Sequence, residues 1–340
     1  MIIHTQAFPR SGVIGNPSDG YYGKTIAFAF TNFSAGIEMW ESPELELLPS
    51  RRDHSVFRNM HSLYDDVRWH GYYGGFRLLK ATVKCFADYV RERGIRIDDR
   101  NFTLRYRSDI PNRVGMAGSS AIISACMRAL MGFYNVTISR HTLANVVRNV
   151  ENNELGIPCG LQDRVAQAYQ GLVYMDFSRD LMEDRGYGNY EVLDAALLPP
   201  VYVAYRQDLS QGTEVYHSDL RRRWSEGEPE VVEAMRYWAR ITDEFRDALL
   251  RGDTPAMNQL INAGFDKRTE LYDVGPGNRD MIATARAVGA SAAFSGSGGA
   301  ICGLYEDEKM FESLVKAFEN KGIRVIKPEI APTTPRDALR

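Results

Sequence analysis

The hydrophobic and polar positions of this chain follow two periods, which predict a mixture of strands and helices. Short apolar or alternating runs between turn residues predict strands at residues 25–30, 102–107, 172–177 and 323–326. Apolar residues spaced three and four apart predict helices at residues 74–93, 119–134, 141–151, 235–252, from 254 onward, 279–288 and 308–321. The helix at residues 119–134 is apolar nearly all round, so we expect it to be buried.

The pattern also suggests how the chain divides. A proline pair before an apolar run, in LLPPVYVAY, marks the best domain boundary, near residue 195. We therefore expect an N-terminal domain at residues 1–194, a C-terminal domain at 195–328 and a loose tail at 329–340. Residues 41–70 lack a clean period and are interpreted as a long substrate loop, and residues 178–190 are polar and contain glycines.

Composition narrows the class of protein. The chain has 340 residues, of which 44% are apolar and 25% charged, typical of a soluble globular protein. A formal net charge of −3 argues against a nucleic-acid-binding protein. We expect no signal peptide and no membrane span, because no long apolar run occurs. The four cysteines are far apart and predict reduced thiols in the cytoplasm.

The first candidate motif is GVIGNPSDGYYGKT at residues 12–25. Its second half nearly matches the phosphate-binding loop G-x-x-x-x-G-K-[ST], with Ser18 in place of the first glycine. A true loop of that type needs a helix directly after it, whereas TIAFAF predicts a strand. A strand–turn–strand hairpin therefore fits better, and Lys24 either binds phosphate or is simply solvated.

The second motif, PNRVGMAGSSAII, places a glycine- and serine-rich loop directly before the buried helix. Gly115 and Gly118 allow close backbone approach, and free N–H groups at a helix start favour an anion. A serine hydroxyl there is also a suitable ligand for Mg²⁺. The alternative is that Ser119 only caps the helix.

Two further motifs add carboxylates and a second glycine loop. ENNELGIPCGLQDR places Glu151 at the end of one predicted helix and Asp163 at the start of the next. Each carboxylate either accepts a substrate proton or binds a metal, or is a helix cap or a solvated charge. Cys159 lacks a partner histidine motif, so packing is its expected role. FSGSGGAICGLY, at residues 294–305, predicts a tight glycine loop between two strands.

In this order the four stretches resemble the GHMP kinase superfamily, which includes galactokinase, homoserine kinase and mevalonate kinase. The resemblance covers about residues 5–325. PRSGVIGNPSDGYYGKT and GMAGSSAII look most like the plant-type glucuronokinases, which phosphorylate the anomeric hydroxyl of glucuronate with ATP. The resemblance implies an α+β, two-domain GHMP kinase fold with the active site in the cleft between the domains.

The resemblance also implies roles for the nucleotide and the reaction. ATP phosphates would be wrapped by a loop consisting of Gly115, Met116, Ala117, Gly118, Ser119 and Ser120. Mg²⁺ would be held by Ser120 and Glu151. Asp163 would be the base near the attacking hydroxyl, and Arg10 would stabilise charge in the transition state.

On the sugar side, the resemblance implies a site formed by Asn16, Asp19, Gly296, Ser297 and Gly298. Asn16 replaces the glutamate of the galactokinase motif, which argues against galactose. A uronate carboxylate needs a cation, for which the candidates are Arg51, Arg52 and Arg268. We expect a cytoplasmic ATP- and Mg²⁺-dependent kinase acting on glucuronate, with a small sugar and ATP as its partners and the oligomeric state left open. The alternatives are a kinase for a heptose phosphate, galactose or arabinose, and a non-catalytic ligand sensor.

Overall fold

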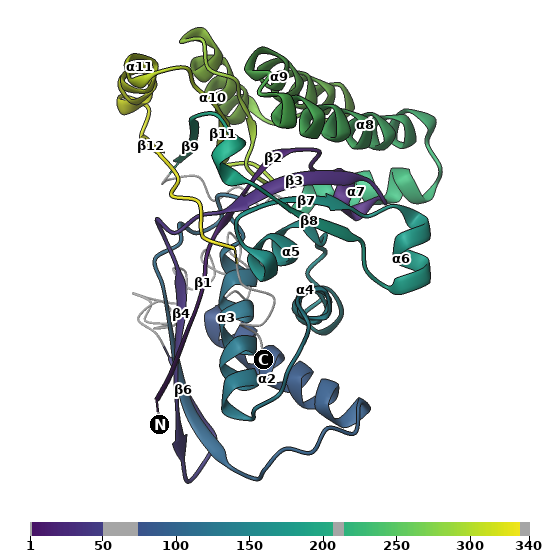
Figure 1. The fold of residues 1–340 in the computed structure, drawn as a ribbon, viewed down its shortest axis with the longest axis vertical. Coiled ribbons are helices and arrows are strands. Elements are labelled where there is room, and N and C mark those ends of the chain that lie inside the picture. The colour runs from purple at the N-terminus through teal and green to yellow at the C-terminus, as the bar shows by residue number, and fades with distance from the viewer. Residues whose placement is uncertain (1, 50–73, 207–213, 334–340) are drawn as a thin grey trace, which may run out of the picture.

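The computed structural model describes residues 2–49, 74–206 and 214–333 (Figure 1). Within these ranges the strands form three four-stranded sheets, which are antiparallel except for the pairing of β5 with β6. The first sheet has the order β1-β4-β6-β5, with bounds Ile2–Ala7, Ala35–Ser42, Asn101–Ser108 and Glu46–Leu48. The second has the order β2-β3-β7-β8, with bounds Arg10–Ile14, Lys24–Ala29, Leu172–Asp176 and Asn189–Leu193. The third has the order β10-β11-β9-β12, with bounds Ala293–Phe294, Ala300–Leu304, Val201–Arg206 and Ile323–Ile326.

Helices pack on these sheets, and along the chain they are interspersed with the strands. The first five in the described ranges are α2 (Gly75–Glu92), α3 (Gly118–Phe133), α4 (Arg140–Asn149), α5 (Gln162–Tyr169) and α6 (Arg179–Arg185). The others are α7 (Glu214–Ser225), α8 (Pro229–Arg251), α9 (Thr254–Leu271), α10 (Pro276–Ala287) and α11 (Glu308–Glu319). The expected α+β class is confirmed.

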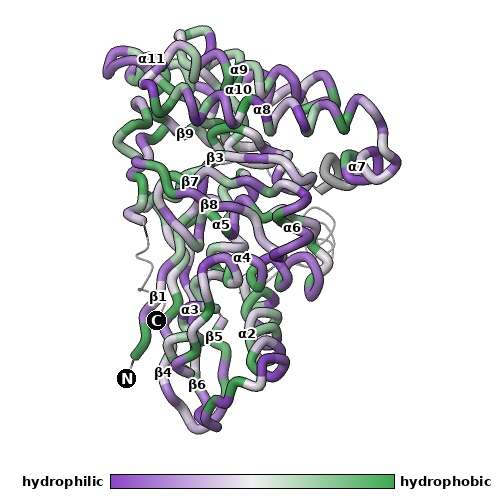
Figure 2. Tube along the Cα trace, turned by 45° about the vertical axis from the view of Figure 1, so that its right-hand side comes forward, coloured by the Kyte–Doolittle hydropathy of each residue, from purple (hydrophilic) through white to green (hydrophobic). Residues whose placement is uncertain are grey.

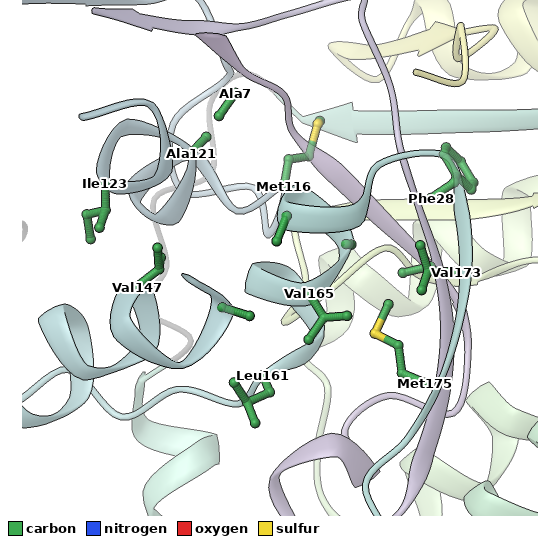
Figure 3. Close-up of a cluster of buried hydrophobic side chains, with 14 of the residues drawn as sticks. Ala7, Phe28, Met116, Ala121, Ile123, Val147, Leu161, Val165, Val173 and Met175 are labelled. Carbon is green, nitrogen blue, oxygen red and sulfur yellow. The ribbon is translucent and has the colours of Figure 1, made fainter. Parts of the chain in front are cut away.

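The core explains why the apolar helix α3 is central. It packs against β1 and β4 on one side and α5 on another, so apolar residues all round the helix find partners. Figure 3 shows Val165 of α5 beside Val173 and Met175 of β7. In the longer helices α8 and α9, hydrophilic and hydrophobic residues alternate along the tube, and α8 packs its apolar face on β3 (Figure 2).

Several expectations from the pattern are confirmed. The stretch at residues 12–25 is a hairpin, with β2 and β3 joined by a short 3-10 turn at Ser18–Gly20. The helix that we expected to end at Gly252 does so, and this glycine has the left-handed conformation usual at a helix C-terminus. The domain boundary near residue 195 stays a prediction.

Other segments add to what the pattern indicated. The polar residues 178–190, for which no element was predicted, contain the short helix α6, none of whose residues is buried. The chain from residue 329 is not loose at first, because Ile330 forms a bridge with Phe30 and the amide of Ala331 donates to the backbone oxygen of Ala29 at 2.8 Å. Most of the long loop expected at residues 41–70 lies outside the described residues, and its first part belongs to β4 and β5. No helix in the described ranges is long and apolar enough to cross a membrane.

Candidate active site

Arg10, the first residue of β2, connects three of the four motifs. Its side chain is buried, and its Nε donates to Oδ1 of Asp163 at 2.6 Å. Nη1 donates to the backbone oxygens of Gly115 at 2.5 Å and Ser295 at 3.1 Å. The loop before α3, the start of α5 and the glycine loop of the third sheet therefore meet around one guanidinium group.

The loop at residues 115–120 has the backbone shape that its glycines suggested. Gly115 has φ +68°, and a Cβ there would lie 2.8 Å from the backbone oxygen of Gly298. Ala117 is also left-handed, with φ 62°, and α3 begins at the next residue. The first N–H groups of a helix have no partner within it, so this end of α3 is suited to bind phosphate.

The two serines at the start of α3 differ in what they contact. The hydroxyl of Ser119 donates to Oε1 of Glu151 at 2.7 Å, whereas that of Ser120 donates to the backbone oxygen of Ala117 at 3.1 Å. The N-cap position makes no side-chain hydrogen bond, so capping by Ser119 is not observed. The serine that contacts Glu151 directly is thus Ser119, and the assignment of Ser120 and Glu151 as ligands of Mg²⁺ stays a prediction.

Glu151 lies in a π-helical turn, Val150–Glu154, that continues α4 beyond its expected end. Its carboxylate is almost completely buried and contacts Nη2 of Arg164. The described residues contain no group of three or more histidine, cysteine, aspartate or glutamate side chains that could hold a metal. A hydroxyl and one carboxylate are oxygen ligands that fit Mg²⁺, which usually takes its other ligands from water and phosphates.

Asp163 lies in the first turn of α5, between two arginines. Arg10 contacts one carboxylate oxygen, and Nη1 of Arg164 lies 3.3 Å from the other. Arg164 therefore bridges Asp163 and Glu151, and it is only 5% exposed. The sequence pattern did not predict this role, because a charged residue in an amphipathic helix usually faces solvent.

Asp19, in the turn between β2 and β3, faces the same site. The amide of Gln162 donates to its Oδ2 at 3.1 Å. Burial, and after it the negative charge of Asp163, raise the pKa of Asp19 to about 6. Gly160 makes room for this carboxylate, since a Cβ on Gly160 would lie only 1.9 Å from Oδ2.

The glycine loop after β10 packs against the loop at residue 115. A Cβ on Gly296 would lie 2.3 Å from the backbone oxygen of Gly115 and 2.8 Å from Nη2 of Arg10. Gly298 has φ +123° and lies beside Asn278. Gly296, Ser297 and Gly298 therefore lie close to the loop at Gly115, and their role in binding the sugar stays a prediction.

Asn16 and Arg268 form a contact that the sequence did not suggest. Arg268 is buried, and its Nη2 donates to the backbone oxygen of Asn16 at 2.6 Å and to its Oδ1 at 2.7 Å. Nη1 donates to the backbone oxygen of Gly296 at 3.3 Å. Arg268 thus joins the hairpin turn to the glycine loop and has few donors left for a substrate. Arg51 and Arg52 lie outside the described residues.

Lys24 and Cys159 both have partners within the protein. Nζ of Lys24 lies 2.7 Å from Asp243 of α8 and 3.5 Å from Asp176 of β7, so this lysine is ion-paired rather than simply solvated, and its role in binding phosphate stays a prediction. Cys159 packs with its Sγ 3.9 Å from the backbone oxygen of Arg148, and burial raises the pKa of its thiol to about 11. All four cysteines are free.

Comparison with known proteins matches the chain to two family models. Residues 78–171 match the GHMP kinases N terminal domain, and residues 245–324 match the GHMP kinases C terminal model. The probable glucuronokinase 2 of Arabidopsis thaliana is 42% identical over 88% of this chain and 83% of its own length. Glucuronokinase 1 of the same plant is 38% identical over 99% of this chain and 94% of its own length. The crystal structure of Lactococcus lactis galactokinase complexed with galactose has the same fold, with a TM-score of 0.76 at 16% identity over 98% of this chain and 95% of its own.

Proposed function

Because this chain belongs to the GHMP kinase family, we propose that it transfers the γ-phosphoryl group of ATP to the anomeric hydroxyl of glucuronate, forming glucuronate 1-phosphate and ADP. The observation that carries the proposal is the group formed by Arg10, Asp163 and the loop at Gly115. The guanidinium of Arg10 contacts both the carboxylate of Asp163 and the loop that leads into α3. Two relatives named as glucuronokinases, similar over most of the chain, support the choice of sugar.

Each residue of this group has a chemical task in the proposed reaction. Phosphoryl transfer depends on positioning and charge neutralisation more than on covalent catalysis. The N–H groups at the start of α3 bind phosphate oxygens, and Arg10 offsets the charge that develops on the transferred group. Asp163 accepts the proton of the sugar hydroxyl, and Asp19 accepts hydrogen bonds from other hydroxyls.

Mg²⁺ is part of this proposal. We assign it to Glu151 together with the serine hydroxyls of α3, and when bound it would neutralise charge on the ATP phosphates. Ser119 already contacts Glu151, which makes it a ligand candidate beside Ser120. The cytoplasmic location expected from the sequence stays a prediction.

A nucleotide-turnover assay with a panel of sugars tests the function. ADP release is measured with glucuronate, galacturonate, galactose, arabinose and a heptose phosphate at equal concentrations. We expect the highest kcat/KM with glucuronate. Faster turnover of another sugar would assign the chain to that substrate, and ATP binding without turnover of any sugar would support a sensor.

A further inference from the structure

One end of helix α7 lies against the turn that carries Asp19. Tyr21, two residues after Asp19, has a buried ring that packs edge-on against Trp224 of α7, with ring centroids 5.4 Å apart. Leu220, on the same face of α7, is also buried. Arg221 lies between Leu220 and Trp224 in the sequence, and its positive charge is close enough to the hydroxyl of Tyr21 to act against the rise that burial causes in the pKa of that phenol. The helix thus holds an arginine next to the sugar side of the site.

Arg221 differs from the two arginines that follow it in its ion pairs. Arg222 pairs with Asp219 and Glu226 on the outer surface of α7, and Arg223 pairs with Glu228. Arg221 is exposed, and no ion pair joins it to a carboxylate among the residues that the structure describes. Its near neighbour Tyr21 is a neutral phenol, so the five donors of the guanidinium remain available for an anion.

We propose that Arg221 and the hydroxyl of Tyr21 bind the carboxylate of the uronate and thereby select an acidic sugar. The proposal rests on the proposed function, which requires a cation for that carboxylate. When the guanidinium donates to the oxygen of Tyr21, the phenol proton remains free to donate to the same anion. Burial raises the pKa of Tyr21 to about 12, so the phenol keeps this proton at neutral pH.

The positions agree with the shape of the substrate. In a hexuronate ring, the anomeric carbon and the carbon bearing the carboxylate lie on opposite sides of the ring oxygen. The anomeric hydroxyl and the carboxylate therefore leave the ring from the two positions beside its oxygen, so the groups that contact them have to lie close together in the site. The charge of Asp163 raises the pKa of Asp19, and the charge of Asp19 raises the pKa of Tyr21, so these three side chains are near one another.

The other described candidate fits the carboxylate less well. Arg268 is buried and donates to three oxygens of the protein, two on Asn16 and one on Gly296. A substrate carboxylate would have to displace these contacts, which join two loops of the site. Arg221 needs no such rearrangement, because its guanidinium is exposed and faces the turn at Tyr21.

The test compares Arg221→Gln with Arg222→Gln on two substrates. Glucuronate carries the carboxylate, and glucuronamide has the same shape without the charge. For Arg221→Gln we expect the KM for glucuronate to rise about ten- to a hundredfold, with the KM for ATP and the kinetics on glucuronamide unchanged. Arg222→Gln removes the same charge one residue away and should behave like the wild type. Tyr21→Phe should raise the KM for glucuronate less, because only one donor is lost.

Two results would overturn the assignment. One is an unchanged KM for glucuronate in Arg221→Gln. The other is an equal rise in KM for glucuronamide, which would mean that the variant disturbs the site as a whole. Thermal unfolding of each variant checks that α7 still packs. Failure of the proposed function would show itself separately, as wild-type protein that releases no ADP with glucuronate.

Discussion

Gly160 gives the sharpest test of how the sugar side is built, because a single methyl group should displace Asp19. A Cβ at this position would lie 1.9 Å from Oδ2 of Asp19, far inside van der Waals contact. In Gly160→Ala the carboxylate has to rotate away and lose its hydrogen bond from the amide of Gln162. A hydrogen bond to a charged group contributes about 1.5–3 kcal/mol. We therefore expect kcat/KM for the sugar to fall about ten- to a hundredfold.

The readout is steady-state ADP release at varied sugar and varied ATP. The loss should appear in the KM for the sugar, while the KM for ATP stays within about twofold, since the phosphate loop is untouched. Gly20→Ala is the matched control, because Gly20 adjoins Asp19 and a Cβ there meets no atom within 4 Å. An unaltered sugar KM in Gly160→Ala, or an equal loss in Gly20→Ala, would refute the reasoning.

Four further predictions concern the carboxylates and serines. Asp163→Asn should lower kcat strongly while ATP still binds, and an unchanged kcat would remove Asp163 from its role as the base. Ser119→Ala and Ser120→Ala should both raise the Mg²⁺ concentration for half-maximal activity. The effect of Ser119→Ala should be the larger, because Ser119 contacts Glu151. A metal titration in which Ser119→Ala matches the wild type would contradict this. Because the pKa of Asp19 is raised to about 6, the KM for the sugar should rise as the pH falls from 7 to 5, and a flat profile would contradict it. The same raised pKa means that the folded state loses stability as the pH rises from about 4 to about 6, so Asp19→Asn should raise Tm at pH 7 and have little effect at pH 4.

Much of the site could be predicted because it depends on short stretches of sequence with a recognisable pattern. Glycines that need a positive φ, a serine pair before an apolar helix and an aspartate opening the next helix are all visible in the sequence. In the structure, Arg10 contacts both Asp163 and the backbone oxygen of Gly115. The assignment of their catalytic roles stays a prediction until variants are measured.

Other features depend on contacts between distant residues and left no local pattern. Lys24 pairs with Asp243, 219 positions away, so no spacing rule could indicate it. Ala117 has a left-handed conformation directly before α3, and an alanine, unlike a glycine, gives no sign of this in the sequence. Helix α6 was missed because it buries no residue and so has no apolar period.

The identity of the product tests the central claim most directly. Wild-type protein is incubated with ATP, Mg²⁺ and glucuronate, and the product is examined by phosphorus NMR with proton coupling retained. The account predicts one new phosphate ester whose phosphorus couples to the anomeric proton of the sugar, formed in equal amount to ADP. An ester at any other hydroxyl, or ADP formed without a sugar phosphate, would contradict the assignment of this chain as a kinase of the anomeric hydroxyl of glucuronate.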